Sequence, residues 1–224
     1  MIKLYEINDE LCQINNVGKF ICYKDDWITK EIKEKGDWES ELNDIFDKFI
    51  NETCNVIDIG AFIGTNTIKM AHKAKHVYAF EANLNIHNLL KANLLINNIS
   101  NVSPFNKAVG NENKIVDKMW YPTVPINYGA MRINKHEDLI NEFVNVNINM
   151  IHLDDITLNE KVDFIKIDVE GCEQEVLQGG IELIKKCKPV IVIENWEKKP
   201  YDILLQLGYN YYKLNYCNEL YVPN

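Results

Sequence analysis

Four apolar segments of strand length in this chain end in residues that could do chemistry. These residues are Gly60, Gly64, Glu81, Asp168, Glu170, Glu194 and Asn195. Because the carboxyl ends of parallel strands meet at one edge of a sheet, we expect them to lie close together. Glycines let the backbone approach a ligand, and carboxylates accept hydrogen bonds, protons or positive charge. The pattern predicts a binding and catalytic site at that edge.

The stretch 55–64 predicts the first half of a nucleotide-binding βαβ unit. A short apolar strand ends at Gly60, a turn runs to Gly64, and residues 65–74 are predicted to form a helix. The next strand, 76–80, ends at Glu81, about twenty residues after Gly60, the spacing at which a carboxylate accepts hydrogen bonds from ribose hydroxyls. The turn lacks the middle glycine of Gly-x-Gly-x-x-Gly, so a dinucleotide pyrophosphate is poorly supported.

The rest of the chain alternates strands and helices. We predict helices over 83–97, 172–186 and 201–207, and strands over 102–109, 163–170 and 189–193. Strands over 209–214 and 219–222 are joined by too few residues for a parallel crossover, so they should be antiparallel. The sequence therefore predicts an α/β, Rossmann-like fold. Its seven-stranded sheet is mostly parallel and ends in an antiparallel C-terminal hairpin.

Two regions lie outside this alternation. Residues 1–50 are predicted to flank the core, as a hairpin within 1–23, a helix over 26–35 and a second helix capped by Asp37; residues 51–224 form the main domain. Trp38 and Glu39 could approach a bound cofactor from this flank, although a surface position is favoured. The excursion 111–151 is loosely patterned, with strands at 114–120, 130–133 and 144–153 and helical turns near 137–143. Its loop, with Tyr121, Tyr128 and Arg132, is predicted to shape an acceptor pocket.

Composition narrows the class of partner. With 224 residues, 46% hydrophobic and 25% charged, the chain is typical of a globular protein with a full core. The net charge of −9 argues against nucleic acid or an anionic membrane as the main partner. There is no apolar segment of membrane-spanning length, and the six cysteines occur singly. We therefore expect a reduced, cytoplasmic protein.

Four motifs occur between Cys54 and Trp196. They are 58–64, Phe80-Glu81-Ala82, Leu153-Asp154 and, most specifically, 163–173. With these motifs the chain resembles the FkbM-like S-adenosylmethionine-dependent methyltransferases. The family usually has Asn where this chain has Phe62, and Pro where it has Ala82. The resemblance implies a class I methyltransferase fold, S-adenosylmethionine as cofactor, and O-methylation of sugar, glycan or other small-molecule hydroxyls.

Several residues are then candidates for holding this cofactor. They are Asp58, Gly60, Ala61, Gly64, Glu81, Ala82, Asn106, Ala108 and Asp168. Asp58 would receive the cofactor's ammonium or order the glycine loop, and Glu81 would bind the ribose. Residues 106–108 lie where an adenine edge would be read.

Candidate catalytic residues lie at the ends of the later strands. Asp168, Glu194 or His152 would remove the proton of the attacking hydroxyl, and Asp168 could also hold the sulfonium charge. Glu170 either shares this face or begins the following helix. Asp168, Glu194 and Asn195 also make a possible Mg²⁺ or Ca²⁺ site, by analogy with metal-dependent catechol-type methyltransferases.

Two other functions stay open on the sequence alone. An NAD-linked oxidoreductase shares the βαβ start but needs the missing pyrophosphate loop. A non-catalytic cofactor-binding or scaffold domain is made plausible by the Phe62 departure. The sequence leaves the oligomeric state open.

Overall fold

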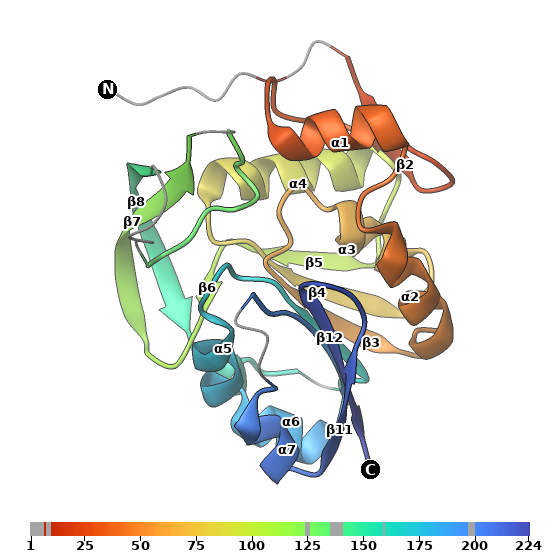
Figure 1. Ribbon diagram of the computed structural model, residues 1–224, viewed down its shortest axis with the longest axis vertical. Helices are drawn as coiled ribbons and strands as arrows, with labels where there is room; N and C mark the ends of the chain where they lie inside the picture. The colour runs from red at the N-terminus through yellow and green to blue at the C-terminus, as the bar shows by residue number, and fades with distance from the viewer. Residues whose placement is uncertain (1–6, 8–9, 124–125, 135–140, 159, 197–199) are drawn as a thin grey trace.

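A seven-stranded sheet runs through the middle of the computed structural model, which describes residues 7, 10–123, 126–134, 141–158, 160–196 and 200–224 (Figure 1). In order across the sheet the strands are β11 (Tyr209–Lys213), β12 (Asn218–Pro223), β10 (Val190–Glu194), β9 (Phe164–Ile167), β3 (Asn55–Ile59), β4 (His76–Phe80) and β5 (Val102–Phe105). The strands from β10 to β5 are parallel, and β12 is antiparallel to both its neighbours. The predicted fold class is confirmed.

Alternation along the central strands places helices on both faces of the sheet. In β3, Val56 packs with α2 (Asn43–Phe49) and α3 (Thr65–Ala71), whereas Ile57 and Ile59 pack on the opposite face. That face is covered by α5 (Glu173–Gly179), α6 (Ile181–Cys187) and α7 (Asp202–Gln206), the blue helices of Figure 1. Burial on both faces explains why β3 is almost continuously apolar.

The N-terminal region packs on the side of α4 (Leu84–Ile96) (Figure 1). Strands β1 (Cys12–Ile14) and β2 (Gly18–Phe20) form the predicted antiparallel hairpin. Helix α1 (Trp27–Lys35) begins at Asp26, whose carboxylate accepts from Thr29 N at 3.1 Å, and ends at Gly36 in the left-handed region. Ile14, Phe20 and Ile28 share a buried cluster with Leu90 of α4, so this flank is packed into the core.

The second predicted N-terminal helix differs from the expectation. A 3₁₀ turn, η1 (Ser40–Leu42), precedes α2, and Asp37 does not cap it. The Asp37 carboxylate instead pairs with Lys69 Nζ of α3 at 2.8 Å. Burying the Lys69 ammonium group without a paired anion would cost more free energy than leaving the start of a helix uncapped, because isolated buried charge is costly.

The excursion after β5 forms a second, smaller sheet. The predicted strand 102–109 is wrong as one element, because Asn106 donates hydrogen bonds to the carbonyls of Glu81 and Ala82 and turns the chain out of the main sheet. Beyond it, β6 (Ala108–Val109) pairs with β8 (Asn141–Ile151), which pairs in turn with β7 (Lys114–Pro122).

Two further expectations within the excursion fail. Residues 130–133 make only an isolated bridge, between Trp120 and Arg132. The helical turns predicted near 137–143 fall partly on 137–140, outside the described residues, and 141–143 are strand in β8. Pairing with β7 overrides the weak helical pattern at this point.

The predicted helix 172–186 is divided. It breaks at Gly180 into α5 and α6. Gly179, the last residue of α5, lies against the chain that follows β6, because a Cβ there would lie 1.9 Å from the carbonyl oxygen of Gly110. This close approach requires glycine at position 179. None of the described helices is both long and apolar enough to span a membrane.

Candidate functional site

A cavity of about 1190 Å³ opens at the carboxyl ends of β3, β4, β9 and β10. Its floor is formed by strand ends, one wall by the N-terminal segment 37–41, and another by the loop 127–134. Asp26, the cap of α1, accepts a hydrogen bond from Tyr128 N at 2.8 Å and so fixes that loop to the N-terminal region. Tyr128 and Arg132 line the cavity as predicted, whereas Tyr121 is buried away from it.

The structure brings most of the predicted site residues to this cavity. Those that line it are Gly60, Ala61, Glu81, Ala82, Ala108, Asp168 and Glu194. Those outside the lining are Asp58, Gly64, Asn106, His152 and Asn195. Cofactor contact and catalysis by the first group stay predictions, and direct contact between the second group and a ligand is not supported by this placement.

The glycine loop is shaped by close approach of two strand ends. Gly60 has φ +86°, and a Cβ there would lie 1.7 Å from the carbonyl oxygen of Asp168. Phe62 has φ +50° although it is not glycine, and its ring lines the cavity. The loop therefore brings main chain, rather than side chains, to the floor beside Asp168.

Asp58 lies behind this loop. Its carboxylate is fully buried and accepts from Thr67 Oγ1 at 2.6 Å, and its Oδ1 has no hydrogen-bond partner among the described residues. Burial raises the pKa of Asp58, and the Lys166 ammonium opposes that shift. Of the two roles predicted for Asp58, ordering the loop agrees with its position.

Glu81 is held in place by two backbone donors. Phe62 N donates to Oε2 at 3.0 Å and Asn83 N donates to Oε1 at 2.8 Å, and the side chain is 7% exposed. Burial raises the pKa of Glu81 to about 7, although both backbone donors act in the opposite direction. Each oxygen keeps a lone pair for a further donor, so the carboxylate could accept from both hydroxyls of a ribose. Asn106 supports this corner by bonding the Glu81 and Ala82 carbonyls.

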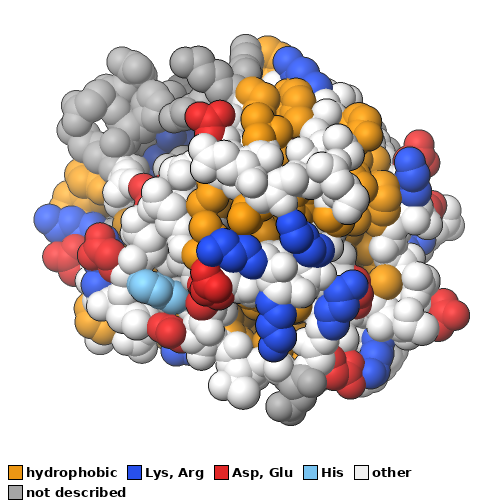
Figure 2. All heavy atoms as spheres, turned by 90° about the horizontal axis from the view of Figure 1, so that it is seen from below, with side chains coloured by type: hydrophobic (Ala, Val, Ile, Leu, Met, Phe, Trp, Pro, Cys, Tyr) orange, Lys and Arg blue, Asp and Glu red, His pale blue; other side chains and the backbone are white. Residues whose placement is uncertain are grey.

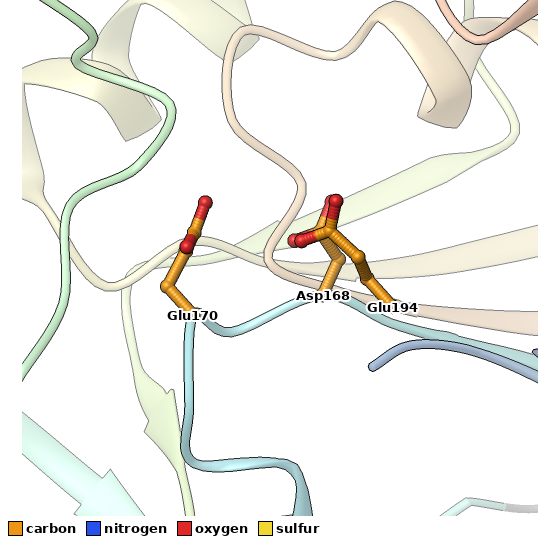
Figure 3. A group of neighbouring side chains, drawn as sticks. All are labelled: Asp168, Glu170 and Glu194. Atoms are coloured by element: carbon orange, nitrogen blue, oxygen red, sulfur yellow. The ribbon is translucent and has the colours of Figure 1, made fainter. Parts of the chain in front are cut away.

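Three carboxylates converge at the other end of the floor. Oxygens of Asp168, Glu170 and Glu194 lie within 4.8 Å of one another, and their side chains point into the same space (Figure 3). Lys166 Nζ lies 2.8 Å from Asp168, and Arg132 Nη2 lies 2.9 Å from Glu170.

Glu194 completes this cluster without a cationic partner at salt-bridge distance among the described residues. Burial, followed by the charges of Asp168 and Glu170, raises its pKa, and it shares a hydrogen bond with Asp168. Burial and Asp168 also raise the pKa of Glu170, against the effect of Arg132. Each raised pKa has a neighbouring carboxylate charge among its causes, so a ligand with a positive centre would relieve repulsion within the cluster.

The predicted metal ligands do not assemble as expected. Asn195 is buried on another side of β10 and donates to Glu219 Oε2 at 2.9 Å. Glu170 takes its place beside Asp168 and Glu194. Because Lys166 and Arg132 already neutralise two of these three carboxylates, the arrangement fits a divalent ion poorly.

His152 is remote from this chemistry. It precedes η2 (Leu153–Asp155), and its backbone N donates to Asn113 Oδ1 at 3.3 Å. Since it does not line the cavity, the geometry gives no support to His152 as a general base.

Two parts of the cavity wall differ from the favoured sequence interpretation. Trp38 and Glu39 line the cavity, which agrees with the alternative left open for them and not with the favoured surface position, and Glu39 accepts a hydrogen bond from Asn66 of α3. Lys166, two residues before Asp168 and on the same side of the strand, is 3% exposed. A lysine inside an apolar strand signals nearby carboxylates, so Lys166 could have been predicted; Glu39 lies in a segment with no periodic pattern.

A known protein-family model matches the part of the chain that forms most of this site. The model described as the methyltransferase FkbM domain matches residues 58–213, which include the glycine loop, Glu81 and the carboxylate cluster. This chain belongs to the FkbM methyltransferase domain family. The predicted family is confirmed, and the segment that carries Glu39 lies before the matched FkbM residues.

Curated relatives and solved structures agree with this family. Methyltransferase 1 of Beauveria bassiana is 26% identical over 142 residues, 55% of this chain and 57% of that protein. Methyltransferase sdnD of Sordaria araneosa is 26% identical over 171 residues, 63% of this chain and 66% of that protein. The chain thus spans about three fifths of the length of these relatives.

Two solved structures share the fold. The methyltransferase FkbM from Methylobacillus flagellatus KT superposes with a TM-score of 0.52 at 18% identity, covering 76% of this chain and 44% of that one. Trm5b from Pyrococcus abyssi superposes with a TM-score of 0.52 at 16% identity, covering 96% of this chain and 54% of that one. At these identities the likeness is one of fold.

Proposed function

We propose that this chain transfers a methyl group from S-adenosylmethionine to a hydroxyl oxygen of a sugar, a glycan or another small molecule. The observation that carries the proposal is that the glycine loop, Glu81 and the Asp168–Glu194 pair line one cavity. Glu81 suits a ribose and the carboxylates suit a positive sulfur centre. Membership of the FkbM family supports the same interpretation.

The half of the cavity beside the glycine loop and Glu81, the donor half, binds and orients the methyl donor. Backbone at Gly60 and Ala61 forms the floor, and the fixed Glu81 carboxylate accepts from the ribose hydroxyls. Lys107 and Ala108 line the side where an adenine ring would lie. When bound, S-adenosylmethionine supplies a methyl group already activated by its sulfonium charge, so the protein mainly positions the partners and excludes water.

The half of the cavity beside Asp168 and Glu194, the acceptor half, removes a proton from the acceptor hydroxyl. The Asp168–Glu194 pair shares a hydrogen bond, so a proton taken from the acceptor hydroxyl is taken by the pair rather than by one residue. The oxygen that loses this proton gains the methyl group, and the sulfur becomes neutral. Lys166 pairs with Asp168 and so holds this carboxylate in position.

A small polar acceptor agrees with the walls of the cavity. Tyr128, Trp38 and Trp196 offer aromatic faces that suit sugar rings, and Arg132 and Glu170 offer hydrogen bonds. A nucleic acid would require a continuous basic surface. The face seen in Figure 2 instead mixes Lys and Arg with Asp and Glu and apolar side chains.

The experiment that tests the proposal is transfer of a labelled methyl group to a panel of glycans and small hydroxylated molecules. Parallel reactions contain Mg²⁺ or a chelator, because the metal requirement is part of the same question. Calorimetry with S-adenosylhomocysteine and NADH separates the proposal from its rivals. Binding of NADH alone indicates an oxidoreductase, and cofactor binding without transfer to any acceptor indicates a scaffold domain.

A further inference from the structure

Glu39 and Asn66 form a hydrogen-bonded pair in the wall of the cavity. Asn66, in the first turn of α3, donates through Nδ2 to Glu39 Oε2. Asn66 is only 5% exposed, and its Oδ1 is buried with no hydrogen-bond partner among the described residues. A buried acceptor without a partner is costly, so this atom indicates a donor beyond those that the described part of the chain supplies.

The backbone at Glu39 is held in an unfavourable conformation to make this pair. Its φ of 49° and ψ of 48° lie in the left-handed region, which non-glycine residues adopt at a cost. Lys69 fixes the preceding residues, because its 4% exposed side chain pairs with Asp37 at 2.8 Å and donates to the Trp38 carbonyl. Strained residues that are fixed by their surroundings are common at ligand sites.

The chemistry of the pair specifies the group that would bind. Glu39 brings a carboxylate and Asn66 an amide oxygen, so the ligand needs several N–H donors and positive charge. A primary ammonium has three donors and one charge, and it meets both requirements. A carboxylate or phosphate ligand would fit poorly, because both side chains present hydrogen-bond acceptors and the Glu39 carboxylate carries charge of the same sign.

The Glu39–Asn66 pair also lies at a suitable distance from Glu81, which would hold the ribose. Glu81 accepts from Phe62 N of the glycine loop, and Asn66 follows Phe62 by four residues. Four residues span at most about 14 Å when extended. In S-adenosylmethionine only the sulfonium sulfur and two methylene carbons separate the ribose C5′ from the α-carbon, so residues that hold the ribose and the α-ammonium would have to lie about this close together.

We propose that Glu39 and Asn66 bind the α-ammonium group of the cofactor's methionyl part. This inference rests on the proposed use of S-adenosylmethionine and adds a contact from outside the residues that the family model matches. The N-terminal segment then completes the cofactor site, in addition to walling the cavity. Asp58, which lies behind the loop, is left with the ordering role.

The test measures binding of three thioethers by calorimetry to the full chain. S-adenosylhomocysteine carries the ammonium and the carboxylate, its decarboxylated form keeps only the ammonium, and 5′-methylthioadenosine lacks both. Glu39→Gln and Asn66→Ala are compared with Glu34→Gln, a change at an exposed glutamate on α1. Circular dichroism and thermal unfolding establish that each variant is folded.

Glu39→Gln should weaken the two ammonium-bearing ligands about ten- to a hundred-fold, the range for a charge-assisted hydrogen bond. Asn66→Ala should weaken them less, and neither variant should change the affinity for 5′-methylthioadenosine. Equal weakening of all three ligands, or none, would overturn the proposal, as would weakening of S-adenosylhomocysteine but not of its decarboxylated form. If the unaltered chain binds none of the three, the proposed function itself fails.

Discussion

Glu81 is buried, and its carboxylate would have to be ionised to bind a ribose in the proposed way. Both of its oxygens already accept from backbone N–H groups, so two further ribose donors require the ionised form. In the free protein its pKa is raised to about 7 by burial. Its charge state therefore changes within the range of ordinary assays.

Cofactor affinity should depend on pH for this reason. Between pH 8 and pH 6 the ionised fraction of Glu81 falls, and the affinity for S-adenosylhomocysteine should fall about ten-fold with it. Calorimetry at several pH values checks this. Glu81→Gln should bind more weakly at every pH and without that dependence; an unchanged pH profile in Glu81→Gln would assign the effect to another group.

Stability of the unliganded protein should change in the opposite direction. A carboxyl whose pKa is higher in the folded state than in the unfolded one holds a proton that favours folding at low pH. That contribution is complete below pH 4.5 and is lost as the pH rises through about 7. We expect the free energy of unfolding to fall by about 2–3 kcal/mol from this group. Urea unfolding of the native chain and Glu81→Gln, compared at pH 5 and pH 8, isolates it.

Asp168 and Glu81 should separate binding from chemistry. Glu81→Ala should weaken S-adenosylhomocysteine about ten- to a hundred-fold through the loss of the ribose contacts. Asp168→Asn should lower the rate of methyl transfer by about a hundred-fold or more, with a smaller effect on cofactor affinity. Measured kcat and Kd values test both. Unchanged behaviour in both variants would remove the cavity floor from the proposed mechanism.

At the scale of elements, the turn between β3 and α3 depends on Gly60. An alanine there would meet the Asp168 carbonyl as well as an unfavourable φ of +86°. Gly60→Ala should destabilise the fold by about 3 kcal/mol or more. Gly171→Ala is the matched control, because its φ is +97° but nothing lies within 4 Å of the added Cβ; it should cost only about 1–2 kcal/mol. Equal losses in thermal or urea unfolding would mean that the clash is relieved by movement of β9.

The elements also mark where sequence reasoning succeeded. The central strands and the C-terminal hairpin were predictable, because their apolar runs and short links depend on local pattern. The departure of β6 from the main sheet depends on hydrogen bonds from Asn106. Such tertiary contacts leave no periodic signal. For the same reason the sequence left two positions open for Glu39, one at the surface and one beside the cofactor, and favoured the surface.

At the scale of the whole molecule, the cavity joins regions that the sequence divides. The division into a flank over 1–50 and a main domain over 51–224 stays a prediction. Residues of both line the same space, and both contribute to one buried cluster. A ligand in that space should therefore stabilise the chain as one unit.

S-adenosylhomocysteine at a hundred times its Kd should raise the free energy of unfolding by about 2.7 kcal/mol. For a chain of this length that corresponds to a rise in Tm of about 5–10 °C. Scanning calorimetry should show one transition that shifts as a whole, and NADH at the same concentration should leave it in place. Two transitions, of which only one shifts, would mean that the flank unfolds independently.

The separate small sheet has a consequence for how such a chain acquires new substrates. The glycine loop and Glu81 follow strands of the main sheet. Tyr128 and Arg132 instead lie in the loop that returns to the small sheet, where Arg132 forms a bridge with Trp120 of β7. The two sheets are joined at the bend after β5 and at the end of β8. Substitutions in the loop 127–134 can therefore reshape one wall of the cavity while the glycine loop and Glu81 keep their positions.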